Sequence, residues 1–435
     1  NRLLATLYKG MPVDQYFDLS QGLGKPQRAD RTDTLEAIRR QLHVASADYN
    51  TYADRADARY GFSGAARGRA FPLAVMHEMP LSRTYYYQWM AYVLTNTILF
   101  SPAYELNSVQ REDVTTVYQR LVARMASHTP IQDIVLEHVM SQENWRRFRS
   151  PEDNTREMME IFLMRFRDDE VPLAALACKN WYLTNRFELR KDKPVNTVPQ
   201  TLLDRNDIVS CEDFYQALVI HPRLIPTLAA RLVDHFFADR DADFKAAFVN
   251  EIVRSEPEYF EDIFDAIIFS RAYLTEVERR NDYEETALGT AGRIGWRAYR
   301  GYFNGLNNGG ADSLANMNQQ AMTYKLGRSP EVPVDSLSLA YYHKSVRDRV
   351  FLRRGTRSGW DPALVENDAV AALSDTDFIH FCFLSTLMRK ATGEELNALL
   401  PMIAAEPRRQ DQAMIVFDYA SRLAELYVMH TASVE

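Results

Sequence analysis

Cysteine, long apolar runs and excess positive charge are all scarce in this sequence. Its 435 residues include three cysteines, Cys178, Cys211 and Cys382, and their number and wide spacing fit neither a disulfide framework nor a Cys-x-x-Cys metal knuckle. We therefore expect them to be buried as small apolar side chains. The most apolar stretch, 90–100, is interrupted by polar residues at 95–97, so it falls short of the roughly 18 apolar residues that a membrane-spanning helix needs. The sequence predicts no transmembrane segment.

The charge balance and the missing motifs exclude several classes of function. The chain has 51 Lys and Arg against 59 Asp and Glu, a formal net charge of −8. A surface that binds nucleic acid needs clustered cations to neutralise phosphates, so we expect no nucleic-acid partner. The sequence also lacks a Gly-rich phosphate loop, a His-Glu-x-x-His zinc motif, an EF-hand loop and a haem-attachment motif. We therefore expect no cofactor and no metal.

Helical periodicity is the strongest positive signal. Apolar residues recur on one helical face through 222–237, and the same pattern runs through 114–125 and 259–268. Strand-like alternation between hairpin turns is scarce. The sequence thus predicts a soluble all-α protein, a large multi-helix globular body with long irregular loops. The residues that these patterns place in the core are Leu228, Leu232, Phe236, Phe260, Phe264 and Ile267.

Three short motifs predict where helices begin. Ser150-Pro151 combines an N-cap side chain with a proline that suits the first helical position. Thr392 and Glu395 have the spacing of a capping box, and Thr-Pro-Ile-Gln at 129–132 has an N-cap residue, a proline and a capping glutamine. We therefore expect a helix to start at each of these places.

Stretches without periodicity divide the chain. Residues 186–209 and 353–367 are polar or carry glycine and proline, so we expect loops there. We expect four regions: an N-terminal helical region at 1–110, a central helical domain at 111–278, a long irregular insertion at 279–336 and a C-terminal helical region at 337–435.

The insertion contains a run, 292–310, that interleaves arginines with aromatic residues and ends in glycines and asparagines. Arg, Trp and Tyr most often dominate the binding energy of protein interfaces, so we expect this run to face a protein partner. The competing interpretation is that the arginines stack on aromatic rings of the same chain. The candidate partner-binding residues are Arg293, Trp296, Arg297, Tyr299, Arg300 and Tyr302.

A second polar cluster occupies 152–160. Arg156 lies four residues from both Glu152 and Glu160, a spacing that places the three side chains on one helical face as a ladder of ion pairs. The alternative is a site in which carboxylates held between helices act as acid and base. The candidate catalytic residues are Glu157, Glu160, His221 and Arg156.

The same cluster carries a family resemblance. Glu-Asp-Asn-Thr-Arg-Glu-Met-Met-Glu-Ile-Phe at 152–162 resembles the N-E-N-x-A-R-E-L-M-E-L-F signature of a bacterial group, domain-of-unknown-function family eighteen hundred. Three later segments, 168–181, 218–237 and 260–273, are similar to its acidic turn with a Trp-bearing helix, its L-x-x-H-P helix and its apolar helix ending in Ser-x-x-aromatic. The resemblance spans roughly 110–275. It implies an all-helical, commonly exported bacterial protein and no established reaction.

The chain departs from the family pattern just after the Trp-bearing helix. The family has a His-Asp pair and a Lys there, whereas 187–193 contains no histidine. A metal or catalytic role for that pair is therefore not carried over to this chain.

Two functions from different classes fit these observations. The favoured one is a non-catalytic scaffold or interaction subunit of a bacterial envelope or extracellular assembly, with other protein subunits as partners. The alternative is a hydrolase-like enzyme with a carboxylate-based site between helices, so the sequence leaves enzymatic activity open while leaning against it. Because the sequence begins at Asn1, a cleaved signal peptide is one interpretation. We expect a periplasmic or secreted location, with the cytoplasm as the alternative.

Overall fold

Helices dominate the computed structural model. Its only strands among the described residues form two small antiparallel sheets of two strands each, and the predicted all-α class is confirmed. The residues that the structure describes are 2–10, 23, 31–62, 70–99, 111–165, 167–277, 279, 281–294, 302–303 and 368–427. They divide into two compact units. Unit 1 takes its described residues from 2–89, 271–303 and 368–427, and unit 2 takes them from 90–270.

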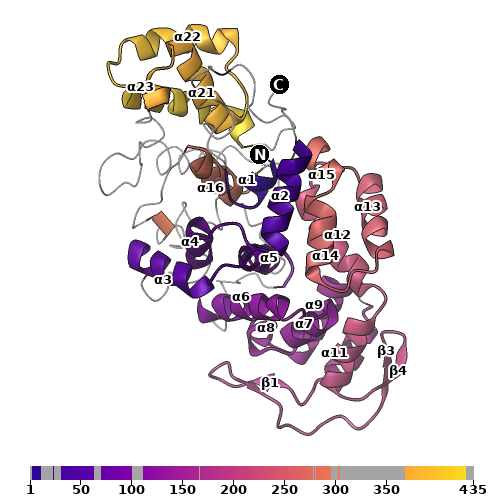
Figure 1. The fold of residues 1–435 in the computed structure, drawn as a ribbon. Coiled ribbons are helices and arrows are strands. Elements are labelled where there is room, and N and C mark those ends of the chain that lie inside the picture. Colours follow the sequence, from indigo (N-terminus) through magenta and orange to yellow (C-terminus); the bar gives the residue numbers. More distant parts are fainter. Residues whose placement is uncertain are drawn as a thin grey trace. The chain divides into compact units, whose positions relative to one another are not determined.

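Unit 2 is a helical body with the strands inserted between two of its helices. Its helices are α6 (Arg111–Ala126), α7 (Ile131–Val139), α8 (Gln142–Arg147), α9 (Pro151–Leu163), α10 (Glu170–Ala177), α11 (Cys211–Ile220), α12 (Leu224–Phe236), α13 (Ala242–Arg254) and α14 (Phe260–Ile268). Its strands are β1 (Tyr182–Leu183), β2 (Leu189–Arg190), β3 (Gln200–Leu202) and β4 (Arg205–Ile208), which pair as β1–β2 and β3–β4. In Figure 1 the pair β3–β4 lies beside α11. The sequence predicted a loop at 186–209, so the structure corrects that prediction.

The core of unit 2 follows the predicted apolar stripes. All six predicted core residues on α12 and α14 are buried, which confirms that prediction. The Phe236 and Phe264 rings meet edge to face with their centroids 6.0 Å apart. Such burial of apolar surface is the main favourable contribution to folding.

All three predicted helix starts are confirmed, and two of them have the predicted side-chain cap. The Ser150 hydroxyl accepts a hydrogen bond from the Asp153 N–H at the start of α9. Thr392 and Glu395 form the capping box of α22 (Gly393–Ala404) in unit 1. The prediction at 129–132 was wrong in detail, because Pro130 is the N-cap of α7 and makes no side-chain cap. The Ile131 N–H donates instead to the Glu258 carbonyl, so a neighbouring segment satisfies the helix end.

Unit 1 joins segments that are far apart in the sequence. Its other helices are α1 (Arg2–Thr6), α2 (Arg31–His43), α3 (Tyr49–Tyr60), α4 (Ala70–Glu78), α15 (Arg271–Glu276), α16 (Tyr283–Arg293), α20 (Asp368–Ala371), α21 (Asp375–Leu387), α23 (Arg409–Ala420) and the short 3-10 helix η6 (Ala424–Leu426). The boundary between the two units falls within α5 (Arg83–Thr97). Helix α16 occupies part of the predicted irregular insertion, so 283–293 corrects that prediction.

Close backbone packing joins α16 to the N-terminal segment. A Cβ atom on Gly10 would lie 2.2 Å from the Gly289 carbonyl oxygen, and one on Gly292 would lie 2.5 Å from the Gly10 nitrogen. A side chain at either position would therefore push the two segments apart, and glycine permits the contact.

Among the described residues, no helix has both the length and the apolar composition that are needed to cross a bilayer.

Candidate functional site

The first predicted site lies on α9, where Glu157 is buried and Arg156 is partly exposed. The Arg156 Nη2 atom is 3.1 Å from Glu157 Oε1 and 3.2 Å from Asp153 Oδ1. The predicted ladder with Glu152 and Glu160 is therefore wrong. A buried carboxylate loses more hydration than its exposed neighbours and needs a cationic partner more, and Glu157 takes the guanidinium for that reason.

His221 lies in a different cluster, at the end of α11. Its Nδ1 atom accepts a hydrogen bond from the Arg223 N–H at 3.1 Å. Its Nε2 atom is 3.6 Å from Asp204 Oδ2 and 3.4 Å from Arg165 Nη1. Because Nδ1 is an acceptor, we infer that the neutral ring carries its proton on Nε2. Burial, and then the charge of Arg165, lower the pKa of His221.

These contacts give His221 a structural role in the turn between α11 and α12. A general base needs a lone pair that faces a substrate, but the lone pair of His221 accepts from the backbone. Arg165 also binds Asp204 at 3.1 Å and approaches Glu170 Oε1 at 3.6 Å, so the cluster is a set of mutual ion pairs. Within the described ranges, no group of three or more His, Cys, Asp or Glu side chains is placed to hold a metal ion.

Two of the predicted partner-binding residues are buried. Arg293 donates hydrogen bonds to the carbonyl oxygens of Ser385 and Thr386, both at 3.0 Å. The Tyr302 hydroxyl is 2.9 Å from that of Tyr283, and the Tyr302 side chain is fully buried. This burial contradicts the prediction that Arg293 and Tyr302 face a partner; both contribute to packing within unit 1. The other candidates, Trp296, Arg297, Tyr299 and Arg300, lie outside the described residues.

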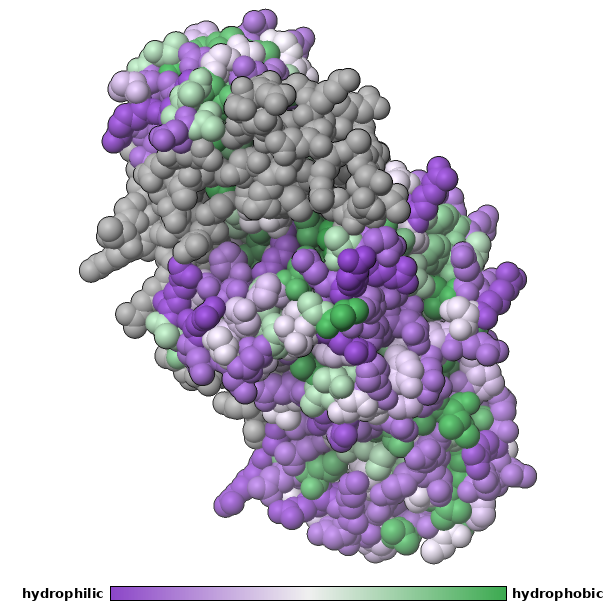
Figure 2. All heavy atoms as spheres, in the orientation of Figure 1, coloured by the Kyte–Doolittle hydropathy of each residue, from purple (hydrophilic) through white to green (hydrophobic). Residues whose placement is uncertain are grey.

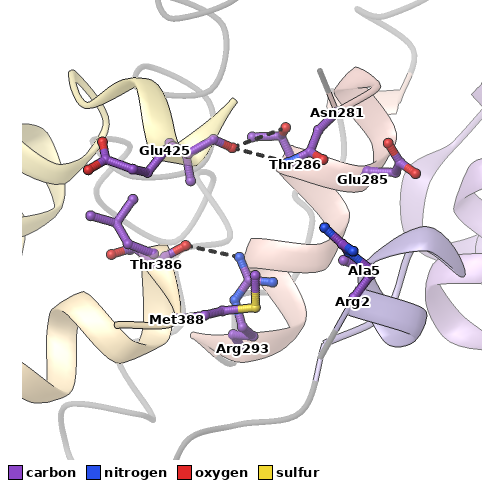
Figure 3. Close-up of a pocket in the computed structure, with 11 residues that line it drawn as sticks. Arg2, Ala5, Asn281, Glu285, Thr286, Arg293, Thr386, Met388 and Glu425 are labelled. Carbon is purple, nitrogen blue, oxygen red and sulfur yellow. Dashed lines mark hydrogen bonds between the residues drawn. The ribbon is translucent and has the colours of Figure 1, made fainter. Parts of the chain in front are cut away.

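A small pocket lies beside Arg293 in unit 1. Figure 3 shows Arg2 and Arg293 reaching it from α1 and α16, with Thr386, Met388 and Glu425 on the opposite side. The space open to the centre of a water molecule is about 20 Å³, little more than the roughly 10–15 Å³ that one water needs. An organic substrate does not fit in this volume.

Hydrogen bonds across the pocket connect distant parts of unit 1. Arg2 donates to the carbonyl oxygen of Tyr273 at 2.7 Å, Arg293 donates to that of Thr386, and Asn281 donates to that of Leu426 at 3.4 Å. The N-terminal helix is thereby joined to α15, and the α16 segment is joined to the C-terminal elements. We interpret the pocket as a structural junction.

A disulfide joins Cys178 to Cys211 in unit 2. Cys178 ends α10 and Cys211 begins α11, and the two are 33 residues apart in the sequence. The prediction that these cysteines form no disulfide was therefore wrong. All three cysteines are buried, as predicted, and Cys382 is free.

The disulfide closes an arm, residues 179–210, that contains all four described strands. Side chains of α8 anchor its first hairpin: Gln142 Oε1 accepts from the Leu189 N–H and Arg146 Nε donates to the Phe187 carbonyl, both at 2.9 Å. Arg146 is itself held by Asp113 of α6 at 2.5 Å. The arm is therefore closed at its two ends by a covalent bond, and hydrogen bonds to α8 and its neighbours hold the first hairpin near its tip.

The far part of the arm is open to solvent. Residues 190–195 and 197–199 are exposed, and they include two valines, Val195 and Val198, that are 57% and 60% exposed. On the face drawn in Figure 2, the region around α11 and the strands is covered mainly by hydrophilic residues with separate apolar ones among them. The arm thus offers an accessible, ordered surface.

The sequence contains one signal for this arm. Two of the three cysteines flank a polar, proline-containing stretch between two helical patterns. A disulfide across such a stretch compensates for its small apolar content.

Comparison of the whole chain with known protein families, curated sequences and solved structures gives no significant match.

Proposed function

We propose that this protein is a non-catalytic interaction subunit that works in an oxidising compartment outside the cytoplasm, as part of an envelope or extracellular assembly. The observation that carries the proposal is the arm at 179–210, which is closed by the Cys178–Cys211 disulfide and exposed beyond it. The predicted periplasmic or secreted location and the predicted protein partners remain part of this proposal.

The disulfide supports the compartment. Structural disulfides persist in secreted and periplasmic proteins, whereas the cytosol of most organisms keeps thiols reduced. Both sulfur-bearing residues are buried, so a soluble reductant reaches them only when the arm opens. An oxidising location accounts for why two helices are joined covalently at this point.

The rigidity of the arm supports a role in binding. An exposed segment that is already ordered loses less conformational entropy when it binds than a flexible one does. The bonds from Gln142 and Arg146 and the disulfide supply this order. Binding residues lie disproportionately on surface segments that a rigid scaffold positions, and the arm is such a segment.

The hydrolase-like alternative fits the geometry less well. A catalytic carboxylate must reach a substrate, but Glu157 is buried and bound to Arg156. His221 belongs to a separate set of contacts with Arg165 and Asp204. These pairings resemble a stabilising network more than an acid–base pair.

Purification from the native source tests the proposal. The tagged chain is isolated under non-denaturing conditions with thiols alkylated at lysis, and its disulfide is mapped by mass spectrometry. We expect an oxidised Cys178–Cys211 bond and a stoichiometric protein partner. A reduced pair in the native extract contradicts the compartment. A partner-free chain that turns over hydrolase substrates, and loses that turnover on Glu157→Gln, contradicts the non-catalytic role.

A further inference from the structure

We propose that the β1–β2 hairpin of the arm is the docking element and that it binds an acidic segment of a partner protein. This inference rests on the proposed function and names the chemistry of the partner. It concerns residues 179–193, which run from the end of the disulfide-bonded helix through the hairpin to the exposed stretch.

The hairpin is basic in an acidic protein. Residues 179–193 contain five cations and two carboxylates, a net charge of +3, whereas the whole chain has a net charge of −8. Opposite charges across an interface steer association and select the partner. A patch whose sign is opposite to that of its own chain is therefore suited to a negatively charged surface.

Within the described residues, three of these cations have no carboxylate partner. Arg190 pairs with Glu188 at 2.8 Å, and Lys191 approaches Glu212 at 3.9 Å. Lys179, Arg186 and Lys193 are exposed and make no ion pair within the described part of the chain. Their charges are thus available to the carboxylates of a partner.

Aromatic rings hold part of this charge in place. The Lys193 ammonium lies 4.1 Å from the centroid of the Tyr182 ring, and that of Lys191 lies 3.5 Å from the centroid of Trp181. Tyr182 and Arg190 are directly opposed in the β1–β2 register, so they share one face of the hairpin. The Tyr182 hydroxyl also donates to Asp192 Oδ1 at 2.9 Å. The cations are therefore presented on an ordered face.

A protein segment fits this surface better than a lipid bilayer or a nucleic acid does. Basic segments that bind anionic lipid carry their cations in a cluster, whereas the five cations of this hairpin are interspersed with Glu188 and Asp192. The neighbouring Val195 and Val198 are exposed and apolar. A peptide that alternates carboxylates with small apolar side chains complements both the cations and the exposed valines, whereas a polyphosphate complements only the cations.

Charge reversal tests the proposal on the intact, disulfide-bonded protein. The probe is a fluorescein-labelled peptide in which glutamate alternates with alanine, and binding is measured by fluorescence anisotropy at low and moderate salt. The test variant is Arg186→Glu with Lys193→Glu. The matched control is Arg254→Glu with Arg271→Glu, which makes the same change in net charge at exposed residues outside the hairpin. All four substitutions are at the surface, and melting temperature with a thiol count verifies the fold of each variant.

We expect the hairpin variant to bind the probe at least about tenfold more weakly, because each reversal replaces an attraction by a repulsion. The control variant should stay within about twofold of the unaltered protein, since screening limits distant charges. Equal losses in both variants overturn the proposal, as does tighter binding to anionic phospholipid vesicles or duplex DNA than to the peptide. Co-purification of the native partner with the hairpin variant overturns this inference and leaves the proposed function standing.

Discussion

Glu285 accepts hydrogen bonds from Arg279 on both of its carboxylate oxygens, at 2.9 and 2.5 Å, and both side chains are buried in unit 1. The same carboxylate accepts the Asp282 N–H at 2.7 Å and so caps α16. Burial raises the pKa of Glu285 to about 7, and the charge of Arg279 opposes that shift. One carboxylate therefore holds the start of α16 and neutralises a buried cation.

Removing one partner of this pair should be costly. In Arg279→Met, Glu285 remains as a buried carboxylate without its guanidinium, and we expect a loss of about 3–5 kcal/mol in the free energy of unfolding. The double variant Arg279→Met with Glu285→Gln removes both charges and keeps a capping oxygen, so it should be more stable than the single variant. Urea denaturation measures both. A double variant that is less stable than the single one contradicts this account.

The core stripe of unit 2 gives a second prediction. Leu232 on α12 is fully buried, so Leu232→Ala should lower the free energy of unfolding by about 2–5 kcal/mol through lost burial and a cavity. Glu251→Ala on α13, an exposed position of the same unit, serves as the control and should change stability by less than about 0.5 kcal/mol. Similar effects of the two substitutions in urea denaturation would refute the assigned core.

The apolar stripe on α12 and α14 was predicted correctly and the arm was not, and both outcomes have one physical cause. The period of a helix is local, so the burial of Leu232 and Phe264 follows from nearby residues alone. The Cys178–Cys211 bond depends on where two helices lie in space. The short strands between them pack on α8, α10 and α11, so they depend on tertiary contacts as well. A short stretch of sequence contains no information about either of these tertiary arrangements.

The candidate site shows the same limit. Spacing placed Arg156 and Glu157 on one helix, but it gave Arg156 the partners Glu152 and Glu160. Several carboxylates lie within reach of one guanidinium, and the structure pairs it with the buried Glu157 and with the more exposed Asp153. In the same way, the composition of 292–310 indicated an interface, while tertiary packing buries Arg293 and Tyr302. Whether a side chain is buried by tertiary packing cannot be predicted from the composition of its segment.

Acid should destabilise the protein through His138. This side chain is buried, and its Nδ1 atom has no hydrogen-bond partner in the described structure. Burial, and then the charges of Arg120 and Arg147, hold its pKa well below the ordinary value of 6.5. Below pH 6.5 the unfolded chain binds the proton more readily than the folded one, so the stability that is present above this pH is lost as the pH falls.

The matching variant is His138→Leu, which removes the titrating group. Each unit of pH below the unfolded pKa costs up to about 1.4 kcal/mol per histidine, so the unaltered protein should lose more stability than the variant between pH 7.5 and pH 5. Urea denaturation of both proteins across this range gives the two slopes. Parallel slopes would show that His138 is protonated equally in both states.

Proteolysis should reveal the closed arm. Arg190 and Lys191 are exposed, and trypsin cleaves after such residues in accessible segments. A cut there falls between Cys178 and Cys211, so the two fragments remain joined by the disulfide. We expect brief digestion to give one band near full length without reductant and two bands with it, and mass spectrometry identifies the cut.

The control for this experiment is Cys178→Ser with Cys211→Ser. The same cut in this variant should release the fragments under denaturing conditions without reductant, because no covalent bond joins them. The variant should also lose about 2–4 kcal/mol of stability, since its unfolded chain is no longer closed into a loop. If the fragments of the unaltered protein separate without reductant, the bond is absent. The arm is then held by non-covalent contacts alone, among them those of Leu189 and Phe187 with α8, and the argument for an oxidising compartment fails.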